Sequence, residues 1–281
     1  MKIVKSIAEM KKISHKIHSS SLKIGFVPTM GFLHEGHLSL IKIAKKMSER
    51  TVVSIFVNPT QFGPNEDYYQ YPRDIKRDKE LLKKEGVHYI FYPSEEEMYP
   101  EGFLTTVKVK KLSEILCGAS RPVHFEGVTT VVLKLFNIIN PDIAVFGEKD
   151  YQQLVIIKKM VMDLNLDISI VSGEIIREQD GIAMSSRNTY LSKEERKQAT
   201  CLYRSLLIAR DWIMAGERNT SIIISRMKEF IKTFPSTKID YIEIVDPETL
   251  NPLKRIKGSA RILLAVWIGK TRLIDNLQVN V

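Results

Sequence analysis

The feature of this sequence that most constrains its fold is an alternation of short apolar runs with amphipathic helical patterns. The apolar runs are rich in Val, Ile and Phe, as buried parallel strands are, and lie at Lys23–Val27, Val52–Val57, Val87–Tyr92 and Asp142–Phe146. The helical patterns lie at Leu38–Met47, Asp74–Glu85, Val128–Ile139 and Asp150–Leu164. This order predicts an α/β fold, a Rossmann-like doubly wound parallel sheet whose ligands bind at the carboxyl ends of the strands.

The pattern changes after Arg177. Ser192 and Glu195 form a capping box that predicts one long helix over Lys193–Ala215, ended by Gly216. A second helix is expected at Ile222–Phe234, followed by strands at Lys238–Val245, Arg261–Ile268 and Thr271–Leu277, with a hairpin turn at Gly269-Lys270. We therefore expect two domains, a Rossmann-like one over residues 1–176 and a smaller C-terminal α+β lid domain over residues 177–281.

Composition excludes some functions and leaves others open. The formal net charge of +9 allows binding to nucleic acid, an anionic membrane or an anionic small molecule. Aromatic residues do not interleave with the lysines, so a solvated lysine-rich surface is favoured and neither a nucleic-acid nor a membrane partner is predicted. The longest apolar runs are too short to span a bilayer. Cys117 and Cys201 are expected to be small buried side chains in a reducing cytoplasm.

The densest cluster of candidate functional residues is Pro28–His37, which follows the first predicted strand and precedes a helix. Gly31 and Gly36 allow tight turning, and a helix that starts near Gly36 presents unpaired N–H groups and a positive dipole end to an anion. His34 and His37 add two imidazole donors beside it. The cluster predicts phosphate binding, although it is neither a GxGxxG nor a Walker A loop.

The same histidines allow a second interpretation, a zinc site. Zinc proteases place two histidines four residues apart on one continuous helix. Here the spacing is three, and Gly36 stands where that helix would have to continue. No metal site is therefore predicted.

The second cluster, Asn58–Gly63, lies at the end of the second predicted strand. The amides of Asn58 and Gln61 suit hydroxyl, carboxylate and carbonyl groups, whereas the simpler alternative is a polar turn that closes a strand. The following loop, Pro64–Arg73, is a candidate active-site lid.

Two further clusters carry charge. In Phe146–Gln153, Lys149 supplies an ammonium for phosphate charge, and Asp150 and Gln153 are expected on the same side. In Arg177–Arg187, the triplet Ser185, Ser186 and Arg187 offers two hydroxyls and a bidentate guanidinium that suit phosphate oxygens. Each is weak alone, and together with the histidine turn they predict a triphosphate site.

These clusters resemble the pantothenate synthetase (pantoate–β-alanine ligase) family of the nucleotidyltransferase superfamily. The resemblance runs from end to end of the chain in family order, through the blocks Pro28–Gly31, Leu33–His37, Asn58–Gly63, Tyr71–Arg73, Arg121–Val128, Phe146–Leu154 and Asp180–Asn188. The His-x-Gly-His turn is similar to the superfamily's HIGH-type signature, and Met184–Arg187 stands in the place of its second signature. The Pro64-Asn65 pair and the divergent C-terminal module depart from the family pattern.

The resemblance implies a ligase that condenses (R)-pantoate with β-alanine to give pantothenate, AMP and diphosphate through a pantoyl-adenylate. It implies that His37 is catalytic, that Gln61 and Gln153 bind pantoate, and that Gln61 and Asn58 bind β-alanine. On physical grounds we expect His34, His37 and Lys149 to stabilise charge on the α-phosphate and the leaving diphosphate. The resemblance also implies a cytoplasmic homodimer, with Mg²⁺ held mainly through the ATP phosphates. The ATP-binding residues that it implies are Met30, Gly31, Phe32, Leu33, His34, Glu35, Gly36, His37, Gly147, Glu148, Lys149, Asp150, Ile176, Met184, Ser185, Ser186 and Arg187.

Two alternatives differ in their chemistry. A nucleotidyltransferase that acts on a phosphorylated acceptor would need extra Arg or Lys where Gln61 and Gln153 stand. A basic RNA-binding module would show strong, salt-dependent affinity for RNA.

Overall fold

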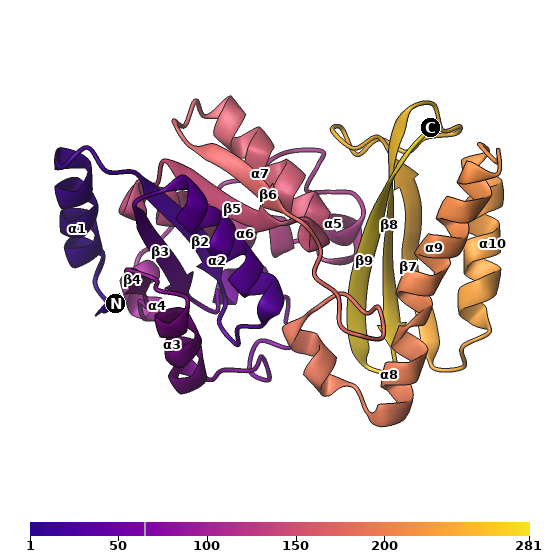
Figure 1. The fold of residues 1–281 in the computed structure, drawn as a ribbon, viewed down its shortest axis with the longest axis horizontal. Coiled ribbons are helices and arrows are strands. Elements are labelled where there is room, and N and C mark those ends of the chain that lie inside the picture. The colour runs from indigo at the N-terminus through magenta and orange to yellow at the C-terminus, as the bar shows by residue number, and fades with distance from the viewer. Residues whose placement is uncertain (65) are drawn as a thin grey trace. The chain divides into compact units, whose positions relative to one another are not determined.

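The computed structural model describes residues 1–64 and 66–281 (Figure 1). The chain forms two compact units. Unit 1 comprises Met1–Glu148 and Ile156–Glu174, and unit 2 comprises Lys149–Val155 and Ile175–Val281. The chain passes between the units after Glu148, after Val155 within helix α7 (Tyr151–Asp163), and after Glu174. No helix in the described part of the chain is long and apolar enough to cross a membrane.

Unit 1 is built on a parallel sheet of six strands in the order β1-β4-β3-β2-β5-β6. The strands are β1 (Lys2–Val4), β2 (Ile24–Thr29), β3 (Arg50–Ile55), β4 (Tyr89–Phe91), β5 (Ile143–Gly147) and β6 (Ser169–Gly173). From β2 the chain adds β3 and β4 on one side, and then β5 and β6 on the other. The switch point of this doubly wound sheet therefore lies between β2 and β5.

Helices cover both faces of this sheet, as two neighbouring residues of β2 show. Successive residues of a strand point to opposite faces. A Cβ at Gly25 would meet the carbonyl oxygen of Ala44 in α2 (Glu35–Met47). The ring of Phe26 instead packs edge-on against Phe136 of α6 (His124–Ile139), 6.4 Å between ring centres. Helices α2 and α6 thus lie on opposite faces of the sheet.

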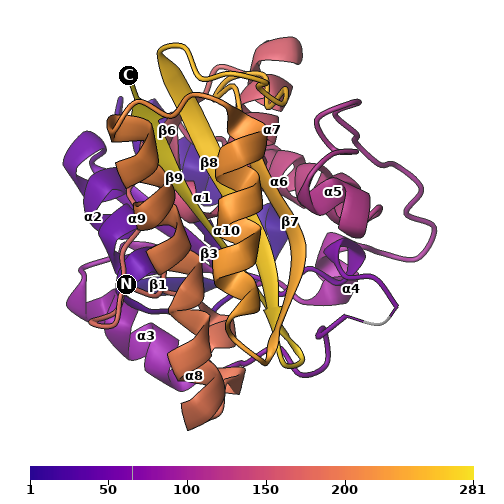
Figure 2. The same cartoon turned by 90° about the vertical axis from the view of Figure 1, so that its right-hand side faces the viewer.

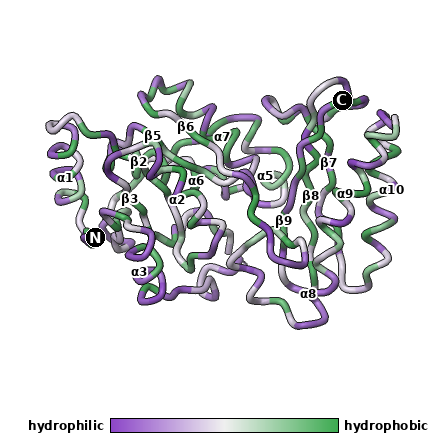
Figure 3. Tube along the Cα trace, viewed as in Figure 1, coloured by the Kyte–Doolittle hydropathy of each residue, from purple (hydrophilic) through white to green (hydrophobic). Residues whose placement is uncertain are grey.

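The other helical segments of unit 1 are α1 (Ile7–Ser19), η1 (Pro59–Gln61), α3 (Ile75–Lys84), α4 (Glu95–Met98), α5 (Cys117–Ser120) and the first residue of η2 (Glu148–Asp150). Asp74 caps α3 by accepting a hydrogen bond from the backbone N–H of Arg77 at 3.0 Å. Figure 3 shows the strands as mostly hydrophobic and α3 as mostly hydrophilic. The apolar core of this unit is therefore built on its sheet, around buried residues such as Val27, Val53 and Ile90.

Unit 2 contains an antiparallel sheet of β7 (Thr237–Val245), β8 (Ser259–Ile268) and β9 (Thr271–Asn280). Helices α9 (Cys201–Met214) and α10 (Thr220–Lys232) pack on one face of this sheet, as Figure 2 shows. The segment η3 (Ser186–Tyr190) and helix α8 (Lys193–Ala199) precede them. A two-residue turn, Gly269-Lys270, joins β8 to β9 as the sequence predicts.

The predicted fold class is confirmed, and the differences are local. The predicted helix over Lys193–Ala215 is wrong as one element, because it divides at Thr200 into α8 and α9. At the break the hydroxyl of Thr200 donates to the carbonyl of Lys197 at 2.7 Å, a local bond that competes with the helical ladder. The structure also contains β1, α1 and the edge strand β6, which were not predicted from the sequence.

Candidate active site

The residues of the first cluster leave the sheet at its switch point, where open α/β sheets bind ligands outside the carboxyl ends of their strands. The turn after β2 begins at Met30, and Gly147 ends the neighbouring strand β5. The hydroxyl of Thr29 donates to the carbonyl of Ser54 at 2.7 Å and accepts from the N–H of Gly31 at 3.2 Å. This side chain fixes the start of the turn.

Two consecutive residues of the turn have left-handed backbone conformations. Gly31 has φ +83° and Phe32 has φ +50°. Such a positive φ is energetically unfavourable for any residue that has a side chain. Asp78 of α3 compensates, because its carboxylate accepts from the N–H groups of Phe32 and Leu33, both at 2.8 Å. The strained turn is thus held by a carboxylate that comes from a different helix.

Asp78, which is only 1% exposed, is not among the site residues predicted from the sequence. Burial raises the pKa of this carboxyl, although the two backbone hydrogen bonds oppose the shift. A signal was present in the sequence, since Asp78 shares the inward face of α3 with Ile75 and Leu82. An acid among apolar residues at helical spacing indicates a specific buried partner.

Replacing Asp78 with Asn should destabilise the turn. An amide presents one acceptor and one donor to the two backbone N–H groups, so one donor is left without a partner at a cost of about 1–3 kcal/mol. We expect a lower free energy of unfolding in urea and slower catalysis. Asp74→Asn on the same helix is the matched control, because Asn caps helices as well as Asp does. Equal stability of the two variants would contradict this account of the turn.

His34 and His37 lie together at the start of α2, where His34 is the N-cap. The N–H of His34 donates to Nδ1 of His37 at 3.3 Å, and the two ring centres are 4.1 Å apart. A neutral His37 therefore carries its proton on Nε2. Both residues are half-buried, and the first turn of α2 adds N–H groups without helical partners.

The amides of the second cluster are buried in a hydrogen-bond network. Asn58 donates through Nδ2 to Oε1 of Gln61 and to the carbonyl of Gly127, both at 3.1 Å. Its Oδ1 accepts from the hydroxyls of Thr60 at 3.0 Å and Tyr99 at 2.8 Å. Asn58 is 1% exposed and Gln61 is 8% exposed, so the turn is rigid and its amides are oriented before any ligand binds.

Helix α6 supports this turn at close range, which the sequence analysis did not predict. A Cβ on Gly127 would lie 2.6 Å from the Cα of Gln61, so only glycine fits. Nδ1 of His124 lies 3.0 Å from the carbonyl oxygen of Gln61. Arg121 forms an ion pair with Glu66 of the predicted lid. Asn65, part of the Pro64-Asn65 departure, lies outside the described residues.

A cavity of about 300 Å³ lies beside the histidine turn. Its walls include Met30 and Phe32 of the turn, Asp78, and Tyr68 and Arg73 from the predicted lid. Arg73 donates to the carbonyls of Tyr71 at 2.9 Å and Tyr68 at 3.1 Å. The lid and the turn thus face one space, while movement of the lid stays a prediction.

The remaining predicted site residues divide between the units. Gly147 and Glu148 belong to unit 1, and Lys149, Asp150 and Gln153 belong to unit 2. Nζ of Lys149 lies 3.9 Å from Oδ2 of Asp150, and the Lys149 side chain is only 20% exposed. Its ammonium is thus held back from solvent, while Asp150 is exposed.

Residues 176–187 form a tight hairpin that continues into η3. The N–H of Met184 donates to the carbonyl of Ile176 at 2.9 Å. Gly181 turns the chain with φ +88°, beside the ring of Tyr203. The hydroxyl of Ser185 accepts from the N–H of Arg187 at 3.3 Å. Ser185 and Arg187 are half-buried, whereas Ser186 is only 5% exposed, so its hydroxyl is the least accessible of the predicted phosphate contacts.

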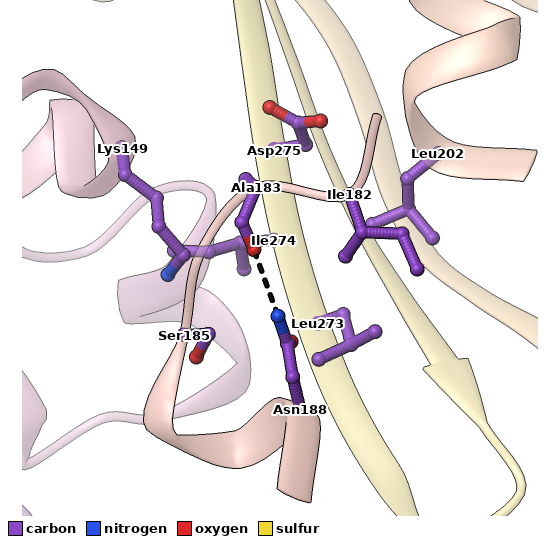
Figure 4. Close-up of a pocket in the computed structure, with 9 residues that line it drawn as sticks. All are labelled: Lys149, Ile182, Ala183, Ser185, Asn188, Leu202, Leu273, Ile274 and Asp275. Carbon is purple, nitrogen blue, oxygen red and sulfur yellow. Dashed lines mark hydrogen bonds between the residues drawn. The ribbon is translucent and has the colours of Figure 1, made fainter. Parts of the chain in front are cut away.

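Unit 2 brings Lys149 and Ser185 to the walls of one small cavity, together with Asn188 and Asp275 (Figure 4). Asn188 donates to the carbonyl of Ala183 at 3.1 Å, the dashed line in the figure. Two of the predicted phosphate-handling segments therefore meet within one unit, although they are far apart in sequence.

The sequence and structure match known proteins over their full length. The model of the family described as pantoate-beta-alanine ligase matches residues 2–278. A pantothenate synthetase of Caldicellulosiruptor bescii is 60% identical over 280 residues, which cover 100% of this chain and 99% of the relative. A pantothenate synthetase of Thermosipho africanus is 58% identical over 279 residues, which cover 99% of this chain and 100% of the relative.

Solved structures agree with these relatives. A crystal structure of pantothenate synthetase from Thermus thermophilus has a TM-score of 0.92 and 46% identity, with 99% of each chain covered. A pantoate-beta-alanine ligase from Francisella tularensis, complexed with beta-gamma ATP and beta-alanine, has a TM-score of 0.81 and 38% identity, with 99% of this chain and 97% of that chain covered. The chain therefore belongs to the pantoate–β-alanine ligase family, whose members are named pantothenate synthetases.

Proposed function

We propose that this ligase joins (R)-pantoate to β-alanine, forming pantothenate, AMP and diphosphate from ATP through a pantoyl-adenylate. The observation that carries the proposal is the pair His34 and His37 at the start of α2, beside the switch point of the sheet. Membership of the ligase family supports the substrates, and the related Francisella tularensis enzyme is complexed with beta-gamma ATP and beta-alanine.

The reaction proceeds in two balanced steps. An oxygen of the pantoate carboxylate attacks the α-phosphorus of ATP, and the bond to diphosphate breaks. The amine of β-alanine then attacks the carbonyl carbon of the mixed anhydride, AMP leaves with the bond electrons, and the amine gives up a proton. His34, His37 and Lys149 stabilise the negative charge that develops on the phosphates in the first step.

Direct attack by the pantoate carboxylate on ATP agrees with the burial of the cysteine thiols. Cys117 and Cys201 are both buried, and burial raises the pKa of Cys201 to about 12. A thiol with that pKa is almost entirely protonated at neutral pH and is a poor nucleophile. This supports an acyl-adenylate over a covalent acyl-enzyme on Cys201.

The proposed assignment of ligand groups keeps all the residues expected from the sequence. ATP is bound by the turns around His34 and Lys149 and by Ile176 and Met184–Arg187, pantoate by Gln61 and Gln153, and β-alanine by Gln61 and Asn58.

Among the described residues no group of three or more His, Cys, Asp or Glu could hold a metal ion. Mg²⁺ is proposed to enter as the ATP complex, held by the phosphates and lowering their charge. The division of the chain into a Rossmann-like domain over residues 1–176 and a lid domain over residues 177–281 also stays a proposal.

Mass-spectrometric identification of the products tests the function. The purified protein is incubated with ATP, (R)-pantoate and isotope-labelled β-alanine. We expect labelled pantothenate and AMP in equal amounts. Transfer of AMP to a phosphorylated acceptor, with no pantothenate formed, would instead indicate another nucleotidyltransferase of the same superfamily.

Replacing Gln61 or Gln153 with Ala should raise the KM for pantoate while leaving ATP binding close to normal. A buried hydroxyl or carboxylate of the substrate loses its partner, which costs about 1–3 kcal/mol, or roughly 5- to 150-fold in affinity. Steady-state kinetics and calorimetric ATP titration measure the two effects. Loss of ATP binding with intact pantoate binding would show that the site is divided differently.

We also propose that the enzyme is a cytoplasmic homodimer, as the family resemblance implies. Two buried cysteines that form no disulfide are compatible with a reducing compartment. Sedimentation equilibrium of the purified chain tests the dimer, and cell fractionation tests the compartment.

A further inference from the structure

Strand β9 carries two buried polar residues next to each other, Asp275 and Asn276, which are 2% and 1% exposed. Adjacent side chains of a strand point to opposite faces of its sheet. Burial of a carboxylate or an amide is unfavourable unless hydrogen bonds replace water. The hydrogen-bond partners of these two residues therefore show which segments β9 holds in place.

On one face, Asp275 holds Arg177 with two charge-assisted hydrogen bonds, from NH1 at 2.6 Å and from NH2 at 2.9 Å. The same guanidinium donates to the carbonyl of Gly181 at 3.0 Å and lies 3.7 Å from the ring centre of Tyr203. Arg177 thus fixes the beginning and the turn of the 176–187 hairpin. A bidentate pair with these added contacts allows little movement.

On the other face, Asn276 holds the backbone of Lys149. Its Nδ2 donates to the carbonyl of Lys149 at 3.0 Å, and its Oδ1 accepts from Nε of Arg261 at 2.8 Å. The Arg261 guanidinium lies 3.9 Å from the ring centre of Tyr151, two residues beyond Lys149. The entry to α7 is therefore tied to the same point of β9.

Apolar packing does not fill the space between these segments. A cavity of about 10 Å³ has Lys149, Ser185, Asn188 and Asp275 among its walls (Figure 4). That volume is about the size of one water molecule. The distance between Lys149 and Ser185 is consequently set by the hydrogen bonds to β9 as well as by packing.

We propose that Asp275 and Asn276 are positioning residues for adenylate formation, which fix Lys149 and the segment Met184–Arg187 relative to each other from the two faces of β9. The inference rests on the proposed function, because it assumes that both segments handle the ATP phosphates. In this proposal neither residue touches the substrate. Both act by setting where other groups stand, and an error of about 1 Å in such geometry costs on the order of 10² in rate.

The first test is Asp275→Asn, which keeps the shape of the side chain and removes its charge. We expect the single-turnover rate of pantoyl-adenylate formation to fall about 10²-fold, the effect of misplacing catalytic groups by about 1 Å. The KM for β-alanine should be unchanged, since the amine enters in the second step. The matched control is Asp240→Asn, because Asp240 also pairs with an arginine, in this case Arg272 of β9, at 2.6 Å. The control should react at the wild-type rate.

A second variant separates positioning from stability. Asp275→Asn leaves the charge of Arg177 buried without its partner, which by itself destabilises a fold. The double variant Arg177→Met with Asp275→Leu removes both charges and fills the space with apolar groups, a replacement that restores stability in other buried pairs. We expect its thermal midpoint to return toward that of the wild type while adenylate formation stays slow.

The other face of β9 has its own matched pair of variants. Asn276→Ala removes the hydrogen bond to Lys149, and Gln278→Ala removes a neighbouring contact on the same face, an acceptor 3.0 Å from Arg261. We expect adenylate formation to slow in the first variant and to be unaffected in the second.

The outcomes distinguish the inference from the proposed function. If the wild type makes no pantothenate, the function is wrong and the comparison of variants has no reaction to measure. If the wild type is active and the stable double variant forms adenylate at the wild-type rate, the positioning role is wrong. Equal slowing by Asp275→Asn and Asp240→Asn would likewise show a general effect on stability and overturn the proposal.

Discussion

Replacing His34 or His37 with Ala is expected to slow pantoyl-adenylate formation by about 10²–10³-fold, the usual cost of one positioned donor that stabilises charge in the transition state. Both rings stand at the start of α2, and their centres are 4.1 Å apart. In the proposed function they meet the phosphates of ATP and not pantoate. Pantoate binding should therefore change far less than the rate.

Single-turnover measurements with excess enzyme follow this step directly, and equilibrium titration gives pantoate affinity. His15→Ala is the matched control, because His15 lies exposed on α1. Since Nδ1 of His37 also accepts from the N–H of His34, circular dichroism should confirm that α2 is intact in each variant. Wild-type rates in both active-site variants would remove the two histidines from the mechanism.

The second half of the reaction should accelerate with pH, by about 100-fold between pH 7 and pH 9 at subsaturating β-alanine. Only the free amine attacks the adenylate, and an alkyl ammonium has a pKa near ~10, by analogy with lysine. The fraction of free amine therefore rises about tenfold per pH unit in this range. Adenylate formation should change less, because the carboxylate of pantoate is ionised throughout.

Rapid mixing of enzyme-bound adenylate with β-alanine at several pH values measures this dependence. Thermal melts at each pH confirm that the enzyme stays folded. A flat profile would mean that the enzyme lowers the pKa of the bound amine or that a different step limits the rate.

Most of the fold could be predicted because its strands are continuous apolar runs, which buried parallel strands require. The elements that were missed lack that signal. Strand β6 (Ser169–Gly173) begins and nearly ends with serine, and β1 (Lys2–Val4) has only three residues. Helix α1 has an inward face that includes Ser14 between Met10 and Ile17, which weakens its apolar pattern.

The candidate site was predictable where its chemistry is local in sequence. His34 and His37 belong to one turn, and Asn58 and Gln61 to another, so short motifs show them. Their supports could not be found this way, because they come from distant elements. Asp78 reaches the turn of Phe32 from 46 residues away, and only the folded chain brings those atoms together.

The same limit applies in unit 2. Arg177 and Asp275 are 98 residues apart in sequence and form a bidentate pair. In a single sequence, Asp275 is one acid in a strand of alternating character, without a visible partner. The structure shows why an ionisable residue is tolerated there, since a guanidinium meets it within the protein.

Exchange of labelled diphosphate into ATP tests the central claim most directly, namely that an acyl-adenylate forms before the amine reacts. The enzyme is incubated with ATP, labelled diphosphate and pantoate, with β-alanine left out. We predict that label enters ATP under these conditions and that no label enters when pantoate is also omitted. Exchange that strictly requires β-alanine would contradict the account and indicate a concerted reaction of all three substrates.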